Sequence, residues 1–383
     1  MALTMVMHMS FYGARMDVAL FALQLGASAA TVGLLTALFG LLPVLLSVSI
    51  GRWADRIGPR FPIQAGASII IAGLMVGFAF GSLPALFVVS LVVGIAYNLF
   101  FVAHQQLVGR VGRPEELATN LSLSSMTFSL SGFISPVITG YAIDRLGAAN
   151  TFLFLALFAA AGLVVVRFNR RVFPDTRFAA KHADATAAAR PRGRVMDLLR
   201  QPELRRVYVV AVLSQSTWDA FTVLMPIYGT ERGFSASSIG ILIGVFSLST
   251  LGIRLLLPAI SRRLKPWQLL LVSLLGSSIS FFGFPLATGM GPLLALSIWL
   301  GIAVGVAAPM LLALIHHASP PDRVGEAVGL RVTMMNGSQT LIPLASGTVV
   351  TAIGITSMFW MLGLGLVSGW WFNRDRWRPA PER

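Results

Sequence analysis

Five charged side chains lie inside long apolar stretches of this sequence, where charge is energetically costly: Arg15, Asp17, Asp219, Arg254 and Arg331. A charge at the centre of a membrane-spanning helix costs about 2.5–3.5 kcal/mol on insertion scales, so ionisable groups in such stretches indicate binding or proton transfer. A carboxylate can take up a proton or pair with a cation, and a guanidinium can hold an anion. We therefore expect these residues to bind a ligand or a proton, or to pair with one another.

The composition is that of an integral membrane protein. Of the 383 residues, 56% are hydrophobic and 11% are charged, which is too little charge to cover the surface of a soluble protein. The net charge of +14 does not indicate nucleic-acid binding, because the basic residues fall in short links between apolar runs and not in one stripe. The sequence has no cysteine, which excludes disulfides and Cys-based metal sites, and its five histidines are scattered. We expect no metal, no cofactor and no nucleic-acid partner.

Twelve apolar runs are each long enough to cross a bilayer, because about 20 helical residues span its hydrocarbon core of roughly 30 Å. The predicted spans are 3–25, 30–50, 61–83, 85–107, 118–141, 149–167, 206–229, 236–258, 267–287, 292–315, 324–350 and 354–373. The first run lacks the basic region and the cleavage site of a signal peptide, so we interpret it as a span. The sequence predicts an all-α integral membrane protein.

The distribution of basic residues predicts the orientation of these spans. Most of the 29 Lys and Arg lie in alternate links and in the tail: 51–60, 108–117, 168–205, 259–266, 316–323 and 374–383. The opposite links hold only Arg145 and Arg232. Because basic loops stay in the cytoplasm, both termini are predicted to be cytoplasmic. The expected location is the cell membrane, as a multi-pass protein of a bacterial inner membrane.

The two halves of the sequence repeat when each residue is compared with the one 207 positions later. Matching pairs include Gly26 and Gly233, Phe39 and Phe246, Gly94 and Gly301, Pro136 and Pro343, and Gly140 and Gly347. A parallel repeat predicts two pseudo-symmetric six-helix bundles, 1–167 and 206–373, that rock around a site near the membrane midplane. The linker 168–205 is rich in Arg, Ala and Pro. It is either a surface for a partner or for anionic lipid, or only a tether, and the tail 374–383 follows the second bundle.

The link Gly-Arg-Trp-Ala-Asp-Arg-Ile-Gly-Pro-Arg at 51–60 resembles the loop between the second and third helices of the major facilitator superfamily. The family pattern is Gly-x-Leu-Ala-Asp-Arg-x-Gly-Arg-Arg, and the matching residues are Gly51, Ala54, Asp55, Arg56, Gly58 and Arg60, whereas Trp53 and Pro59 depart from it. The resemblance implies a secondary transporter with this loop as a conformational gate. We expect Asp55 to steady the outward-facing state at the positive N-terminal end of the helix that begins near Val324, with Arg331 as a further partner.

In this superfamily, helices one, four, seven and ten line a central cavity. The resemblance therefore implies candidate substrate- or proton-binding residues on these helices: Arg15, Asp17, Tyr97, Asn98, Trp218 and Asp219. Asp17 and Asp219 are expected to carry protons or to meet a cationic substrate group, and the alternative is a fixed ion pair with an arginine. Arg15 either holds an anionic substrate group or neutralises Asp17. Arg254 and Arg331 contact either the substrate or only a loop.

Proline and small residues predict hinges in the fifth and eleventh spans, at Pro136, Gly140, Pro343 and Gly347. The fifth span resembles the exporters' pattern Gly-x-x-x-Gly-Pro-x-x-Gly-Gly, with Ser or Thr in place of three glycines, which favours export. The fourth span, in contrast, lacks the arginine that many drug/proton antiporters of the family carry there. His104, His316 and His317 are expected at the wet ends of helices.

No motif in the sequence supports catalysis, since there is no phosphate-binding glycine loop and no Ser/His/Asp arrangement. We expect a monomeric transporter in contact with membrane lipids, closest in pattern to bacterial efflux and drug-antiporter-like members. Its expected activity is proton-coupled efflux of a small organic solute, with the proton gradient as energy source. The alternatives are proton-coupled uptake of an organic anion or zwitterion, and a non-transporting membrane sensor on the same fold.

Overall fold

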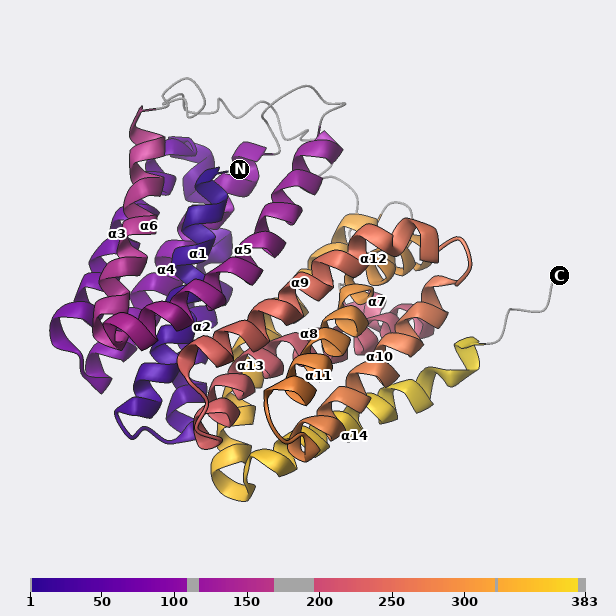
Figure 1. The fold of residues 1–383 in the computed structure, drawn as a ribbon. Helices are drawn as coiled ribbons and strands as arrows, with labels where there is room; N and C mark the ends of the chain where they lie inside the picture. Colours follow the sequence, from indigo (N-terminus) through magenta and orange to yellow (C-terminus); the bar gives the residue numbers. More distant parts are fainter. Residues whose placement is uncertain (1, 109–116, 169–195, 321–322, 378–383) are drawn as a thin grey trace. The chain divides into compact units, whose positions relative to one another are not determined.

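The structure, a computed structural model, describes residues 2–108, 117–168, 196–320 and 323–377. Within these ranges the chain forms α-helices joined by short turns, and no β-strand occurs (Figure 1). Ten of the described helices are long and apolar enough to cross a membrane. The predicted all-α membrane fold is therefore confirmed, whereas twelve spans and cytoplasmic termini stay predictions.

The helices follow the predicted spans along the chain. The first half contains α1 (Ala2–Gln24), α2 (Ala29–Ile57), α3 (Arg60–Phe80), α4 (Leu83–Val108), α5 (Leu117–Leu146) and α6 (Ala148–Phe168). The second half contains α7 (Met196–Arg200), α8 (Pro202–Glu231), α9 (Ala236–Ile260), α10 (Pro266–Gly283), α11 (Met290–Gly305), α12 (Ala307–Ala318), α13 (Val324–Ile353) and α14 (Ile355–Asn373). Two 3-10 turns follow α10 and α14, at η3 (Phe284–Leu286) and η4 (Arg374–Trp377). Helices α1 and α13 are not among the ten candidate spans, and both contain several polar residues.

The chain divides into two compact units. Unit 1 comprises Met1–Pro191 together with Pro226–Gly244, and unit 2 comprises Arg192–Met225 together with Val245–Arg383. Unit 1 therefore includes the tip of the α8–α9 hairpin, although this hairpin belongs to the second half of the sequence. In unit 1, α1 packs against α5 and α6, and α3 packs between α4 and α6. In unit 2, α10 packs against α11, α12 and α14.

The same glycine contact occurs once in each unit, at positions that the repeat pairs. In unit 1, a methyl group on Gly94 of α4 would lie 2.6 Å from the backbone oxygen of Phe39 in α2. In unit 2, a methyl group on Gly301 of α11 would overlap the backbone oxygen of Phe246 in α9. Only glycine lets these helix backbones approach so closely. The repeat thus extends from matching residues to matching contacts.

Helix ends also repeat between the two halves. Gly26 and Gly233 lie in the turns before α2 and α9, and both adopt positive φ angles, of 79° and 73°. Gly147 and Gly354 precede α6 and α14 with φ angles of 82° and 85°. Such left-handed backbone ends a helix at little cost only in glycine. These tight turns occur at paired positions, so the helices of the two halves begin at corresponding points of the repeat.

The structure refines two of the predicted boundaries. Helix α2 continues to Ile57, so the predicted ten-residue link 51–60 shortens to Gly58, with a φ of 82°, and Pro59. Arg52, Asp55 and Arg56 therefore belong to the last turns of α2, and Arg60 begins α3. The predicted span 292–315 is interrupted at Val306, between α11 and α12. An interruption of a helix leaves backbone carbonyls without a partner inside the helix, and a side chain can donate hydrogen bonds to them.

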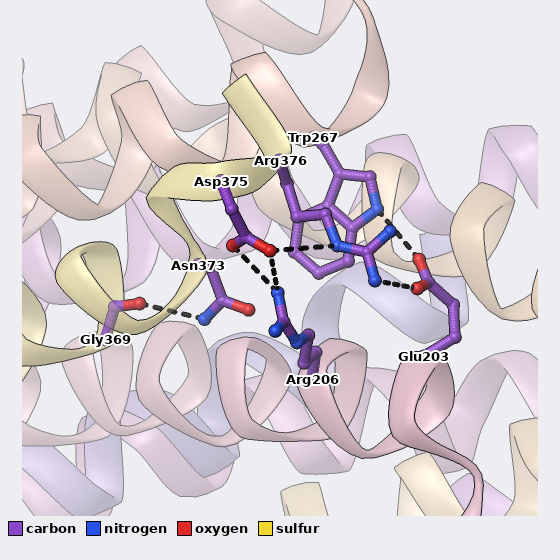
Figure 2. A network of polar contacts seen from close by, with 7 residues as sticks. All are labelled: Glu203, Arg206, Trp267, Gly369, Asn373, Asp375 and Arg376. Atoms are coloured by element: carbon purple, nitrogen blue, oxygen red, sulfur yellow. Dashed lines mark hydrogen bonds and ion pairs between the residues drawn. The ribbon is translucent and has the colours of Figure 1, made fainter. Parts of the chain in front are cut away.

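Polar and aromatic side chains hold η4 against α8 and α10 within unit 2 (Figure 2). Arg206 of α8 donates hydrogen bonds of 2.8 and 2.6 Å to the two carboxylate oxygens of Asp375. Arg376 forms an ion pair with Glu203, and the indole nitrogen of Trp267 donates to the same carboxylate at 3.2 Å. These contacts link the end of α14 to the starts of α8 and α10.

Candidate functional site

One face of α1 carries polar and aromatic side chains toward α4. His8, Phe11, Tyr12 and Arg15 are three or four residues apart, so they share this face. The Phe11 ring stacks on Tyr97 with a centroid distance of 3.9 Å, and the His8 Nδ1 atom forms a hydrogen bond with the Tyr97 hydroxyl group. Arg15 follows one turn later, and its Nη2 atom is buried without a hydrogen-bond partner in the described part of the chain. The face could therefore accept a planar or anionic ligand group.

Small and polar residues occupy a different face of α1, which packs against α5 and α6. Ser10 donates a hydrogen bond of 3.0 Å to the Leu155 carbonyl, and a methyl group on Gly13 would lie 2.6 Å from the Thr139 hydroxyl oxygen. Asp17 lies one turn beyond Gly13 and has an exposed fraction of 0%. Neither of its carboxylate oxygens has a hydrogen-bond partner among the described residues, and the same holds for the Thr139 hydroxyl group.

The two charged residues of the first helix are therefore separated. Arg15 and Asp17 are two positions apart, which is about 200° around a regular helix. Since α1 is an unbroken α-helix, Arg15 lies on the face of the Tyr97 stack and Asp17 on the face toward α5 and α6. Of the two predicted fourth-span residues, Tyr97 is buried in the aromatic cluster and Asn98 is half-buried beside it.

Histidines extend the polar part of unit 1 beyond the predicted residues. His8 was not among the predicted residues, although it is buried in the first span and bonds to the predicted Tyr97. His104, which was expected at a wet helix end, is buried and shares a 2.8 Å hydrogen bond with the Thr4 hydroxyl group. Its ring also stacks on Phe100, with a centroid distance of 5.5 Å. A neutral histidine is a costly polar group in an apolar run, and this signal could have indicated that both residues are buried with polar partners.

Unit 2 contains a second buried carboxylate, that of Asp219 in α8. The side-chain nitrogen of Gln215, one turn earlier, donates to its two oxygens at 3.1 and 3.2 Å. Asp219 has an exposed fraction of 1%, and the adjacent Trp218 packs against Phe246 with a centroid distance of 4.8 Å. Asp219 and Trp218 were predicted site residues and Gln215 was not, although its i, i+4 spacing from Asp219 on one helix could have indicated it.

The two arginines predicted to contact either the substrate or a loop, Arg254 and Arg331, have different surroundings. The Nε atom of Arg254 in α9 donates a hydrogen bond of 3.3 Å to the carbonyl of Gly305, where α11 ends. A cation at a helix C-terminus is favourable because the helix dipole is negative there. Arg331 in α13 is half-buried, and its Nε atom is buried without a hydrogen-bond partner within the described ranges.

The predicted gate is described only in part. The side chains of Gly51, Asp55 and Arg56 lie outside the described residues. Gly58 ends α2, and Arg60 is buried, with its Nη2 atom 3.5 Å from the Arg167 carbonyl near the end of α6. The proposed contact between Asp55 and the start of α13 therefore stays a prediction.

The predicted hinge in the fifth span lies at a close contact between α5 and α9. Pro136 and Gly140 are inside α5, and a methyl group on Gly140 would overlap the Ala236 carbonyl. A methyl group on Gly240 of α9 would in turn overlap the Pro136 carbonyl. Asp144 accepts hydrogen bonds from the backbone nitrogens of Ala236 at 3.0 Å and Ser237 at 2.9 Å. The paired residues Pro343 and Gly347 lie in the interior of the α13 sequence, and both are buried from solvent.

Comparison with known proteins identifies the family. The model of the Major Facilitator Superfamily matches residues 1–296 and 274–383. The chain belongs to this superfamily. It is 24% identical over 347 residues to the "Uncharacterized MFS-type transporter YuxJ" of Bacillus subtilis, with 86% of this chain and 83% of that protein covered. It is 26% identical over 373 residues to the "Putative sugar efflux transporter" of Deinococcus radiodurans, with 94% and 87% covered.

Solved structures show the same fold in other transporters. A peptide transporter of the POT family in complex with 5-aminolevulinic acid superposes with a TM-score of 0.79 at 16% identity, covering 98% of this chain and 94% of that one. The nucleoside transporter NupG, in a point-mutant form, superposes with a TM-score of 0.78 at 15% identity, covering 98% and 99%. This Major Facilitator Superfamily member is therefore a multi-pass membrane transport protein and not an enzyme.

Proposed function

We propose that this protein exports a small organic solute from a bacterial cell in exchange for protons, with both termini in the cytoplasm. It works as a monomer by alternating access, in which the two halves of the sequence expose the bound solute to one side of the membrane at a time. The paired glycine contacts at Gly94 and Gly301 support a two-bundle mechanism. The printed name of the Deinococcus radiodurans relative supports export.

The buried carboxyl group of Asp17 is the observation that carries proton coupling. An ionised carboxylate without a hydrogen-bond donor is strongly disfavoured in an apolar environment. Asp17 is fully buried and neither oxygen has a described donor. A group in this position changes its charge only when the surrounding helices move and admit water or a ligand. Proton uptake and release at Asp17 would thereby be linked to the motion of α1 against α5 and α6.

The carboxylate of Asp219 has a different role in this proposal. Gln215 donates to both of its oxygens, which stabilises the ionised form inside unit 2. A stable negative charge beside the Trp218 ring suits a cationic or hydrogen-bonding group of the solute. Asp219 therefore contributes to solute binding, and Asp17 contributes to proton coupling. The hydroxyl group of Tyr97 and the amide group of Asn98 add polar contacts from the first half.

Transport in proteoliposomes tests this proposal. The purified chain is reconstituted, and a panel of labelled sugars, nucleosides and small peptides is screened with and without a pH gradient. We expect one solute class to move against the direction of the protons, and Asp17→Asn to abolish the effect of the gradient while solute exchange at equal pH continues. Asp197→Asn is the matched control, because that carboxylate is half-exposed and pairs with Arg200 in the same short helix. Gradient-driven transport that survives in Asp17→Asn would exclude the coupling role of Asp17.

Uptake of an organic anion or zwitterion is the second candidate. It is favoured by Arg15 and Arg331, each of which has a buried guanidinium nitrogen without a described partner. Such groups would be satisfied by a carboxylate of the solute. In the same liposomes, this function predicts that an anionic solute moves in the direction of the protons and that Arg15→Gln weakens its binding. A non-transporting sensor would instead bind a solute without moving it under any gradient.

A further inference from the structure

Three buried hydroxyl groups follow one face of α5, on the side that packs against α1. They belong to Ser131, Ser135 and Thr139, which are four residues apart and fully buried, so they lie on successive turns of the helix. A methyl group on Gly13 of α1 would lie 2.6 Å from the Thr139 hydroxyl oxygen, and Asp17 lies one turn beyond Gly13. We call these three residues the hydroxyl column, and its Thr139 end is the end near Asp17.

Hydrogen bonding within α5 explains only the far end of this column. A Ser or Thr hydroxyl group inside a helix commonly donates to the carbonyl one turn earlier, as Ser131 does to Thr127 at 2.7 Å. Ser135 instead donates to the Met9 carbonyl of α1 at 2.8 Å. The Thr139 hydroxyl oxygen is buried and has no hydrogen-bond partner among the described residues. Toward its Thr139 end, the column therefore no longer bonds to its own helix.

The column occupies the positions at which this sequence departs from the exporters' pattern. In Gly-x-x-x-Gly-Pro-x-x-Gly-Gly, Ser131, Ser135 and Thr139 take the place of the first three glycines. Glycine at these positions would also let two helices pack closely, because it has no side chain. Packing of α1 against α5 therefore does not require hydroxyl groups here, and their presence indicates a chemical role.

The repeat separates the column from the common scaffold of the two halves. The position 207 residues after Asp17 holds Leu224, and the position paired with Ser135 holds Ile342. The two outer positions of the column pair with serines. The second half thus lacks both the carboxyl group and the middle hydroxyl group. The continuous column occurs together with the buried carboxyl group, which indicates that it serves Asp17.

The column leads from Asp17 toward the predicted cytoplasmic end of α5. Eight residues separate Ser131 from Thr139, which is about 12 Å along the helix. Ser131 lies five residues inside the apolar span Met126–Leu146. By the distribution of basic residues, the link before α5 is cytoplasmic, so this end of the span faces the cytoplasm. Asp17 lies about 22 Å along α1 from its first residue, so a proton released there has to cross much of the membrane.

We propose that the hydroxyl column is the route by which the Asp17 proton leaves for the cytoplasm. This inference rests on the proton coupling of the proposed function. Because the Cβ atoms of side chains one turn apart are about 5–6 Å from one another, one water molecule bridges each gap when α1 and α5 move apart.

Proton transfer along the column changes no group except Asp17. As the carboxyl O–H bond breaks, the proton passes to the first water molecule, and each water or hydroxyl group then accepts one proton and releases another. One proton reaches water at the cytoplasmic end, and Asp17 keeps the negative charge. The Thr139 hydroxyl group then donates a hydrogen bond to this carboxylate, which stabilises it.

Rapid-mixing infrared spectroscopy tests the column without a known solute. The purified protein in lipid nanodiscs is mixed into buffer of higher pH, and the loss of the protonated carboxyl band of Asp17 is followed in time. The band is identified by its absence in Asp17→Asn. In Thr139→Val, Ser135→Ala and Ser131→Ala we expect the loss to slow about tenfold or more, as for the removal of a hydrogen bond to a charged group.

Two further variants separate the route from general packing effects. Thr139→Ser keeps the hydroxyl group and should restore the rate of the parent. Ser346→Ala is the matched control, because Ser346 pairs with Thr139 in the repeat and its hydroxyl group is equally buried without a described partner. This control should leave the rate unchanged, since the second half has Leu224 in place of the carboxyl group. Monomeric elution with a retained thermal transition shows that each variant is folded.

Three results would overturn the route. The first is an unchanged rate in Thr139→Val, and the second is equal slowing in Ser346→Ala. The third is slowing in Thr139→Val but not in Ser131→Ala, which would show that the proton does not travel along the column. The proposed function fails separately: if the rates change as expected but no solute moves against protons in liposomes, the route stands and the transport assignment falls. A spectrum without an Asp17 band at any pH would contradict both.

Discussion

The contact between Gly301 and α9 gives a sharp prediction about stability. Carbon atoms in contact lie about 3.5–4.0 Å apart. A methyl group on Gly301 would lie 2.9 Å from the Ser249 Cβ atom and 3.0 Å from the Phe246 carbonyl carbon. The helices would have to separate by about 0.5–1 Å to admit it. Because the Phe246 atoms belong to the backbone, no change of rotamer can relieve the overlap.

The size of the effect follows from two opposing terms. Overpacking costs about 1–3 kcal/mol, and the upper part of this range applies because the backbone must move. Replacing glycine by alanine inside a helix returns up to about 1 kcal/mol. We therefore expect Gly301→Ala to lower the free energy of unfolding by about 1–2 kcal/mol. Gly252→Ala on α9 is the matched control, because a methyl group there meets no atom within 4 Å. It should raise the same free energy by about 0.5–1 kcal/mol.

Equilibrium unfolding in detergent micelles measures both variants, with the eight tryptophans as fluorescent reporters. The expected outcome is a difference of opposite sign between Gly301→Ala and Gly252→Ala. Equal destabilisation by the two substitutions would refute the packing argument, because it would show that alanine is unfavourable in these helices regardless of its neighbours. A stable Gly301→Ala protein would mean that α9 and α11 can separate at little cost.

Three further predictions concern the polar groups. Gln215→Leu removes the two hydrogen bonds to Asp219 and should weaken solute binding about tenfold or more. Binding is measured as the solute concentration that half-saturates exchange, and unchanged binding would show that Asp219 does not bind the solute. Tyr97→Phe keeps the ring stack and loses one hydrogen bond, so it should cost about 1 kcal/mol in thermal denaturation, whereas Tyr97→Ala should cost several times more. Arg206→Ala breaks the partly exposed pair with Asp375 and should destabilise the protein by no more than about 1 kcal/mol, with a smaller effect at high salt. The Arg206 guanidinium also lies over the Phe372 ring, 5.4 Å from its centroid, and a larger effect that salt does not change would indicate that this contact dominates.

Much of the fold could be predicted because apolar length and repeated glycines are local signals. The turns at Gly26 and Gly233 and the close contacts at Gly94 and Gly301 all occur at positions that the sequence pairs. The predicted link 51–60 was longer than the link in the structure, because its charged residues are typical of a loop. Charged residues also occur in the last turns of a helix that leaves the membrane. Periodicity alone does not distinguish the two.

The site was harder to predict because it depends on which face of a helix a residue occupies. The sequence placed Arg15 and Asp17 in one span, but only the packing of Gly13 against α5 and α6 assigns Asp17 to that side. Asp144 gave no signal, since an acidic residue at a helix end is ordinary on a protein surface. Its hydrogen bonds to the start of α9 join residues far apart along the chain, and a single sequence does not reveal such contacts.

Proton movement coupled to solute movement is the most direct test of the proposed mechanism. Liposomes that contain the purified protein and a trapped pH indicator are loaded with the solute identified in the screen, and an outward solute gradient is then imposed. The mechanism predicts that the lumen acidifies as the solute leaves, and that Asp17→Asn stops the pH change while solute exchange at equal pH continues. Solute efflux from the parent protein without any change of luminal pH would contradict proton exchange and the role assigned to Asp17.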